Sequence, residues 1–119
     1  MNDADRSRLL ELLHETFGHR EFRPGQEPVI QHVAEGRDAL VVMPTGAGKS
    51  LCYQLPAVFR GGVTLVVSPL IALMKDQVDA MSALGVPTTF INSSISPDER
   101  NARMDQVRAG EIRLLYVAP

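Results

Sequence analysis

Residues 39–50 read Ala-Leu-Val-Val-Met-Pro-Thr-Gly-Ala-Gly-Lys-Ser, and this stretch decides the fold class of the chain. The run Ala39–Met43 is continuously apolar, which is typical of a strand buried on both faces of a parallel sheet. Gly46 and Gly48 follow shortly after it. Because glycine lacks a Cβ, the backbone there can curl with its N–H groups pointing inward. A strand, a glycine-rich turn and the start of a helix, in that order, predict a phosphate-binding loop.

The other residues of this loop have the chemistry that nucleotide phosphates require. Lys49 supplies a positive charge for the β- and γ-phosphates, and the Ser50 hydroxyl can ligate Mg²⁺. Thr45 and Ala47 complete the loop, and Met43 stands at the first position, where the general pattern has glycine. The alternative is a glycine-rich turn that merely caps a helix. The Gly-Lys-Ser sequence after an apolar run favours phosphate binding.

The remaining hydrophobic pattern predicts an α/β fold with a parallel sheet. Short apolar runs typical of buried strands cover Val63–Val67, Thr88–Ile91 and Ile112–Val117. Helices are expected between these runs and the first run, Ala39–Met43, over Lys49–Val58, Leu70–Leu84 and Pro97–Ala109. Ahead of the first strand, helices are expected over Leu9–Phe17 and Pro24–Glu35, ended by Gly18 and Gly36. Strand, helix and strand in succession indicate βαβ units with right-handed crossovers.

Composition places the chain among ordinary globular proteins. Its 119 residues, 45% hydrophobic and 22% charged, suit one domain. No apolar run approaches the ~18 residues that span a bilayer, and the acidic N-terminus lacks the basic segment of a secretory signal. We therefore expect a cytoplasmic protein without a membrane partner. The net charge of −2 means that any contact with nucleic acid is local.

The single cysteine, Cys52, cannot form an internal disulfide, which fits a reducing compartment. It lies near the start of a predicted helix beside the phosphate loop. A lowered thiol pKa is one interpretation of that position, and a small buried side chain is the favoured one.

Four segments of the chain carry a family resemblance. They are Phe17–Gln26 (FGHREFRPGQ), Met43–Gln54 (MPTGAGKSLCYQ), Val67–Gln77 (VSPLIALMKDQ) and Leu114–Pro119 (LLYVAP). Together they resemble the start of a RecQ-family DNA helicase of superfamily 2. The resemblance implies an ATP-dependent 3′→5′ DNA helicase of DNA repair and recombination, in a bacterial-type, nucleoid-associated location. It also implies a truncated RecA-like P-loop domain, with N-terminal helices and an adenine-recognition motif in residues 1–36 and P-loop βαβ units in residues 37–119.

The same resemblance assigns nucleotide-binding roles to individual side chains. Gln26 carries a donor and an acceptor side by side, the pair that reads adenine, and would select ATP over GTP. Arg23 would stack on the adenine, and His19 stands where the family commonly places an aromatic side chain on the opposite face. Without its neighbours, Gln26 would be taken for a solvated helix residue. The loop residues would hold the ATP phosphates and Mg²⁺: Thr45, Gly46, Ala47, Gly48, Lys49 and Ser50.

A second set of residues is assigned to DNA by the resemblance. Ser68 and Pro69 follow a predicted strand and precede a helix. The Ser68 hydroxyl and the nearby N–H groups could therefore hold a phosphate of single-stranded or partly duplex DNA. Lys75 is a further candidate, although a lysine on a solvated helix face is the commoner explanation.

Hydrolysis of ATP needs carboxylates that hold the metal and orient the attacking water. The family takes both from an Asp-Glu-Ala-His sequence after a buried strand, and no apolar run here ends in an acidic pair. We therefore expect an N-terminal fragment that binds ATP without hydrolysing it, with Lys49 as its contribution to catalysis in a parent helicase. The alternatives are a stand-alone inactive nucleotide-binding module and an unrelated small P-loop kinase, which would leave Phe-Arg-Pro-Gly-Gln unexplained. A reading frame that continues past Pro119 into Asp-Glu-Ala-His would favour the helicase.

Overall fold

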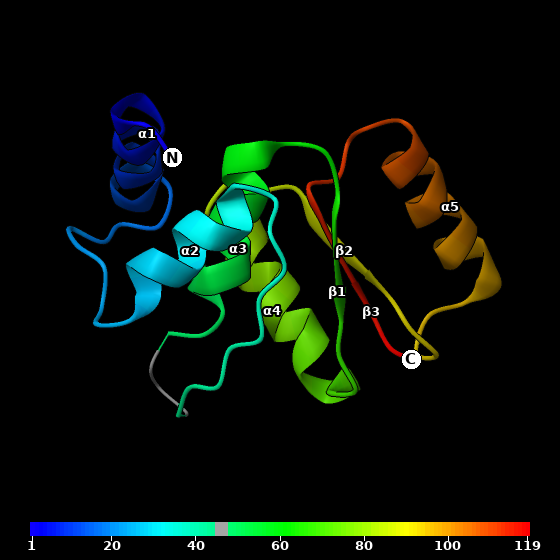
Figure 1. Cartoon of the computed structure of the whole chain (residues 1–119). Helices are drawn as coiled ribbons and strands as arrows, with labels where there is room; N and C mark the ends of the chain where they lie inside the picture. The colour runs from blue at the N-terminus through cyan, green and yellow to red at the C-terminus, as the bar shows by residue number, and fades with distance from the viewer. Residues whose placement is uncertain (45–47) are drawn as a thin grey trace. The chain divides into compact units, whose positions relative to one another are not determined.

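The computed structural model describes residues 1–44 and 48–119. The chain forms two compact units, Met1–Arg60 and Gly61–Pro119. Figure 1 shows that the described part of the first unit is helical, whereas the second combines strands and helices. Among the described residues, no helix is long and apolar enough to cross a membrane.

The first unit consists of helices packed around an apolar core. They are α1 (Asp3–Glu15), α2 (Gln26–Ala34) and α3 (Leu51–Arg60). The predicted apolar stripe of α1 is confirmed, because Leu9, Leu12 and Leu13 are buried in a cluster with Ile30 of α2 and Leu55 of α3. Removing such aliphatic side chains from water is the main favourable contribution to packing.

Both helices ahead of the phosphate loop end near the glycines that the sequence singles out. Gly18 has φ of +73° and Gly36 has φ of +85°, a left-handed backbone that favours glycine. The Gly18 N–H donates to the His14 carbonyl at 3.1 Å, and the Gly36 N–H donates to the Val33 carbonyl at 2.9 Å. These bonds satisfy carbonyls that a helix end leaves without partners.

The strand predicted over Ala39–Met43 is wrong. These residues form no strand, and the side chains of Leu40 and Val42 are 95% and 91% exposed. Their apolar run matches a buried strand, but a strand is stable only where a neighbour completes its hydrogen-bond ladder. The βαβ unit expected at the start of residues 37–119 therefore lacks its first strand. The segment is instead an irregular connection that leads from α2 to the phosphate loop.

The second unit is the parallel sheet that the sequence predicts. Its elements are β1 (Thr64–Val67), α4 (Ile71–Ala83), β2 (Thr88–Ile91), α5 (Pro97–Arg108) and β3 (Leu114–Val117). Both strand pairs are parallel, in the order β1-β3-β2. The two right-handed crossovers run in opposite directions across the sheet, so α4 and α5 cover opposite faces (Figure 1). The predicted α/β class, a parallel sheet with flanking helices, is confirmed.

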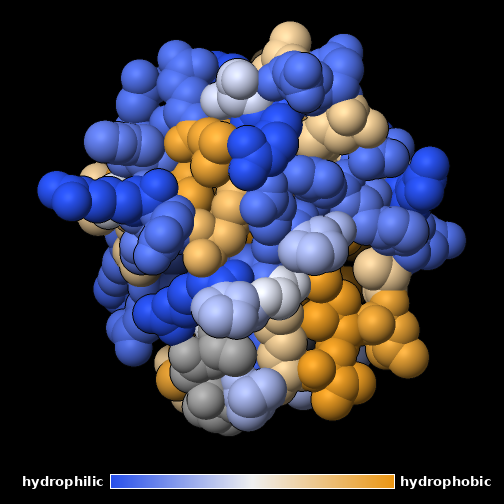
Figure 2. Space-filling model, turned by 60° about the vertical axis from the view of Figure 1, so that its left-hand side comes forward, coloured by the Kyte–Doolittle hydropathy of each residue, from blue (hydrophilic) through white to orange (hydrophobic). Residues whose placement is uncertain are grey.

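Burial differs sharply between β3 and β1. Leu114 and Tyr116 of β3 are fully buried, whereas Leu65 and Val67 of β1 are 58% and 62% exposed. The other edge strand, β2, is buried at Thr88 and Thr89, so the exposure of β1 concerns Leu65 and Val67 and is not shared by both edges. On the face of the molecule drawn in Figure 2, apolar side chains also reach the surface, in patches between polar residues.

Candidate nucleotide-binding site

A tight turn ahead of α2 organises the candidate site. It is formed by residues 23–26, Arg-Pro-Gly-Gln, and the Gln26 N–H donates to the Arg23 carbonyl at 3.1 Å. Gly25 has φ of +85° and ψ of −11°, which after a proline matches a type II turn. That turn needs a left-handed residue at its third position, which glycine supplies without strain. Because of this turn, α2 begins at Gln26 and later than the predicted start at Pro24.

The buried side chain of Gln26 links this turn to the phosphate loop. Gln26 is 3% exposed. Its Oε1 accepts a hydrogen bond from the Arg23 backbone N–H at 2.8 Å, and its Nε2 donates to the Gly48 carbonyl at 3.0 Å. A side-chain amide offers two lone pairs and two N–H groups, so each end has the capacity for one further partner. The residue predicted to read adenine therefore adjoins the predicted phosphate loop.

Gly48 makes this contact possible. Its φ of +81° lies in the left-handed region. A Cβ built on Gly48 would collide with Gln26 Nε2 and would lie 3.6 Å from Arg23 Cδ. Both the backbone conformation and the close approach of Gln26 therefore require glycine here.

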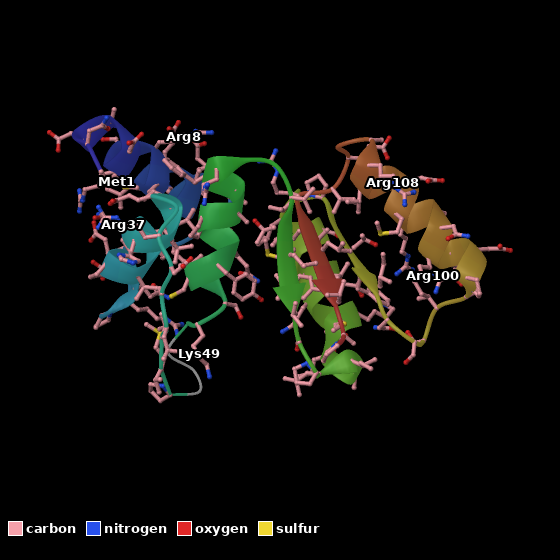
Figure 3. All side chains as sticks on the ribbon, turned by 45° about the vertical axis from the view of Figure 1, so that its right-hand side comes forward. Met1, Arg8, Arg37, Lys49, Arg100 and Arg108 are labelled. Atoms are coloured by element: carbon pink, nitrogen blue, oxygen red, sulfur yellow. The ribbon has the colours of Figure 1, made fainter. Side chains whose placement is uncertain are left out.

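Lys49 and Ser50 lie between this contact and α3. Both are exposed, and Figure 3 shows Lys49 at the N-terminal end of the helix. The Cys52 N–H donates to the Lys49 carbonyl at 3.1 Å, and the Gln54 N–H donates to the Ser50 carbonyl at 3.0 Å. The first turn of α3 thus holds Lys49 where the helix dipole favours anions. The other predicted loop residues lie outside the described residues: Thr45, Gly46 and Ala47.

Cys52 is a buried side chain beside this loop, as the favoured interpretation predicts. It is 8% exposed, and its Sγ lies 3.9 Å from the Gly48 carbonyl. Burial raises the pKa of the Cys52 thiol. The alternative hypothesis of a lowered pKa is therefore wrong, because loss of solvation disfavours the thiolate.

The two residues predicted to stack on adenine, His19 and Arg23, are exposed and lie outside the helices. Arg23 is in the turn described above, beside Gly48. His19 follows α1, and its backbone N–H donates to the Leu13 carbonyl at 3.1 Å. Stacking of either side chain on a base stays a prediction.

The residues predicted to contact DNA lie in the second unit, around the start of α4. The Ser68 Oγ accepts from the Leu70 N–H at 3.1 Å, and the Ser68 N–H donates to the Val117 carbonyl at 2.9 Å. Pro69 is exposed. Lys75 is exposed on α4 and forms an ion pair with Asp79 at 2.7 Å, which raises the pKa of Lys75. The Ser68 hydroxyl therefore stabilises the turn into α4, whatever else it binds.

Carboxylates are missing from the carboxyl ends of the described strands. The residues that follow β1, β2 and β3 are Ser68, Asn92 and Ala118. In residues 1–44 and 48–119, no group of three or more His, Cys, Asp or Glu is placed to hold a metal ion. Within these ranges, the predicted protein ligand for Mg²⁺ is the Ser50 hydroxyl alone.

Two features of the site escape sequence reasoning. The Pro-Gly dipeptide is a standard turn signal, and it could have indicated the left-handed Gly25. The contact between Gln26 and Gly48 joins residues 22 positions apart, and no local pattern indicates it.

Parallel strands joined by helices on both faces, with a glycine-rich segment leading into a further helix, define an α/β protein of the RecA-like P-loop class. Comparison with family descriptions is consistent with this class, because residues 23–119 match "DEAD/DEAH box helicase". The chain belongs to the DEAD/DEAH box helicase family.

Curated relatives narrow the resemblance further. The chain is 51% identical over 110 residues to the ATP-dependent DNA helicase RecQ of Haemophilus influenzae, covering 92% of this chain and 18% of that protein. It is 45% identical over 113 residues to the protein of the same name from Bacillus subtilis, covering 94% of this chain and 19% of that protein. The chain is also 48% identical over 116 residues to the ATP-dependent DNA helicase Q5 of Rattus norvegicus, covering 94% of this chain and 12% of that protein. The resemblance to RecQ-family helicases is confirmed, and the chain spans less than a fifth of the length of each of these three relatives.

Proposed function

We propose that this chain binds ATP as the nucleotide-binding part of an ATP-dependent DNA helicase of the RecQ type. The observation that carries the proposal is the Gln26 side chain, which bonds to the Arg23 turn and to Gly48 at once. A single nucleotide can reach both of these features, because its base and phosphates are covalently linked. The names of the relatives supply the class of reaction for the longer protein.

Each predicted residue has one task in this proposal. Gln26 reads the base through the free N–H and lone pair of its amide, while Arg23 and His19 stack on the base faces. Lys49 neutralises the phosphates from the N-terminal end of α3, where the helix dipole adds to its charge. The residues of the loop that lie outside the described ranges contribute backbone N–H groups, as their glycine content suggests.

Mg²⁺ enters this proposal together with the nucleotide. The ion prefers six oxygen ligands, keeps several waters, and often takes only one or two ligands from protein beside the substrate phosphates. The exposed Ser50 hydroxyl at the start of α3 fits one such ligand. When bound, the ion neutralises charge on the phosphate oxygens.

DNA is the proposed macromolecular partner, with repair and recombination as its setting and the cytoplasm as its location. Ser68, Pro69 and Lys75 contact the sugar–phosphate backbone in this proposal. The ion pair of Lys75 with Asp79 is compatible with that role, because exposed ion pairs are weak and a phosphate can replace the carboxylate.

Equilibrium binding of ATP and GTP to the chain in the presence of Mg²⁺ tests the proposal. Wild type should prefer ATP, and Lys49→Ala should weaken both nucleotides by at least about tenfold, because a charge facing the phosphates is lost. Gln26→Ala should bring the two affinities together, because base readout is lost. Arg8→Ala on α1 is the matched control, since it also removes an exposed cation from the first unit. A nucleotide preference that survives Gln26→Ala would contradict the adenine assignment.

ATP hydrolysis by a longer protein distinguishes the two hypotheses. The helicase proposal predicts such hydrolysis, whereas a stand-alone inactive nucleotide-binding module does not. We expect the chain of 119 residues to show no ATPase activity above background, with or without single-stranded DNA. A longer reading frame that supplies the acidic pair should hydrolyse ATP in a DNA-stimulated reaction that Lys49→Ala abolishes. Multiple-turnover hydrolysis by the 119-residue chain would point to a carboxylate already present, with Asp76 and Glu99 as the first to replace.

A further inference from the structure

We infer that Met43 is a positioning residue for the turn of residues 23–26, which carries the proposed readers of adenine. This inference rests on the proposed function. It concerns the position at which this chain has methionine and the general phosphate-loop pattern has glycine. The terminal methyl carbon of Met43, Cε, lies 3.7 Å from the place that a Cβ on Gly25 would occupy. The side chain of Met43 therefore lies against the turn ahead of α2.

Met43 also attaches its own segment to the core of the first unit. Leu40 and Val42 are 95% and 91% exposed, so their side chains contribute little to packing. Met43 is partly buried and packs against the apolar cluster that α1, α2 and α3 form. An unbranched thioether side chain suits such an irregular space, because it has several rotatable bonds and a polarizable sulfur. One side chain thus contacts both the core and the turn.

Gly25 leaves the space that the Met43 methyl group occupies. Its φ of +85° favours glycine, and the missing Cβ keeps this side of the turn open. The same turn carries Arg23 and Gln26, and the Arg23 N–H donates to Gln26 Oε1 at 2.8 Å. A contact that restrains the turn at Gly25 therefore restrains both side chains that the proposed function assigns to the base.

The consequence is that Met43 affects recognition of the base more than binding of the phosphates. A glycine at position 43 would have no side chain with which to reach Gly25 or the core. The turn would then have to be ordered by the base when nucleotide binds, and the entropic cost would weaken base recognition. ATP and GTP have the same phosphates, so the phosphate contribution cancels in the ratio of their dissociation constants. This ratio therefore reports on the role of Met43.

Equilibrium binding of ATP and GTP in the presence of Mg²⁺ measures that ratio. Met43→Gly removes the whole side chain, whereas Met43→Leu keeps an apolar group for the core and lacks Cε. Both should lower the preference for ATP over GTP by at least about threefold, the fold-change that corresponds to one lost buried methyl contact. Val42→Ala is the matched control in the same segment and should keep the wild-type preference, because Val42 is exposed.

Urea unfolding of the same variants separates positioning from stability. Met43→Leu should unfold close to the wild-type midpoint, because it conserves most of the apolar volume in the core. Its lower preference for ATP then reflects the contact with Gly25. If Met43→Gly and Met43→Leu weaken ATP and GTP by the same factor, Met43 supports only the fold and the inference is wrong.

Nuclear magnetic resonance tests the contact itself. In the wild-type chain, the methyl resonance of Met43 should show a nuclear Overhauser effect to the α-protons of Gly25. The backbone N–H resonances of Gly25 and Gln26 should shift in Met43→Leu and should stay in place in Val42→Ala. A Met43 methyl group without an Overhauser effect to Gly25 would overturn the inference.

The wild-type chain separates failure of this inference from failure of the proposed function. If wild type prefers ATP and the Met43 variants keep that preference, the inference fails and the adenine assignment stands. If wild type binds neither nucleotide, or binds both equally, the proposed reading of adenine fails, and the inference fails with it.

Discussion

At the scale of single residues, Gly48 is constrained by its backbone and by a neighbour at once. Its φ of +81° costs other L-residues roughly 1–2 kcal/mol. A Cβ would also displace the Gln26 amide, and a buried polar group without its partner costs ~1–3 kcal/mol. Gly18 in the same unit has a similar φ of +73°, but nothing lies within 4 Å of a built Cβ. Substitution of Gly18 therefore introduces backbone strain alone, whereas substitution of Gly48 adds a collision with Gln26.

We expect Gly48→Ala to lower the free energy of unfolding more than Gly18→Ala does, by about 1–3 kcal/mol. Urea unfolding followed by circular dichroism measures both losses. Adding Gln26→Ala should restore part of the loss caused by Gly48→Ala, because it removes the side chain that the new Cβ meets. Equal losses for the two glycine variants would mean that Gln26 places no constraint on residue 48.

A pH dependence is expected from Cys52. Burial raises its pKa above that of a free thiol, so the folded chain disfavours the thiolate. A group with a raised pKa stabilises the folded state below the pKa of the free thiol, and this contribution is lost as the pH rises through the raised value. The urea midpoint of wild type should therefore fall more than that of Cys52→Ala between neutral pH and a pH of about 10. Parallel falls in the two proteins would rule out this contribution.

At the scale of elements, α5 combines a capped N-terminus with a position at the surface. None of its residues is buried. The Ser96 Oγ accepts from the Glu99 N–H at 3.2 Å, which is the cap that a Ser-Pro-Asp-Glu sequence at a helix start favours. The Arg103 guanidinium lies 4.5 Å from the centroid of the Phe90 ring and donates to the Phe90 carbonyl at 2.7 Å. The Ser96 cap and the contacts of Arg103 with Phe90 are therefore two specific interactions that stabilise α5.

Ser96→Ala should lower the free energy of unfolding by about 1 kcal/mol, because one of the first N–H groups of α5 loses its acceptor. Hydrogen exchange should also become faster for the Glu99 N–H, while exchange in α4 stays as in wild type. Ser93→Ala is the matched control, since Ser93 is exposed in the loop that precedes the cap. If both substitutions cost the same, the cap does not stabilise α5.

At the scale of the whole molecule, neighbours decide which apolar runs become strands. Residues 39–43 and 114–117 are both short apolar segments. In the first, Leu40 is 95% exposed, whereas Leu114 in the second is fully buried between β1 and β2. An apolar run gains a ladder only from strands beside it, and each buried backbone group left without one costs ~1–3 kcal/mol.

Native-state hydrogen exchange should therefore separate these two segments. Amides of Leu40–Met43 should exchange at rates close to those of an unfolded chain, and amides of Leu114–Tyr116 should be the slowest in the second unit. The buried centre of β3 supplies an internal reference in the same sample. Strong, cooperative protection of Leu40–Met43 in a soluble monomer would contradict this prediction and would indicate a strand there.

Most helices and strands were predictable because their signals are local. The apolar stripe of α1, the glycines that end α1 and α2, and the Ser96 cap of α5 each depend on residues within a turn or two of one another. The runs that became β1, β2 and β3 were also recognisable, and alternating strands and helices indicated their parallel pairing.

Features that join distant parts of the chain depended on tertiary packing. The irregular path of Ala39–Met43 contradicts its own pattern, because an apolar run shows a preference for burial and does not supply the neighbouring strand. The order β1-β3-β2 and the hydrogen bond from Gln26 to the Gly48 carbonyl also join residues that are distant in the sequence. The residue types at positions 26 and 48 suggested a reader of adenine and a phosphate loop. Their contact was decided by the turn at Gly25 and the packing of α2 beside α3, because these place the two residues within hydrogen-bond distance.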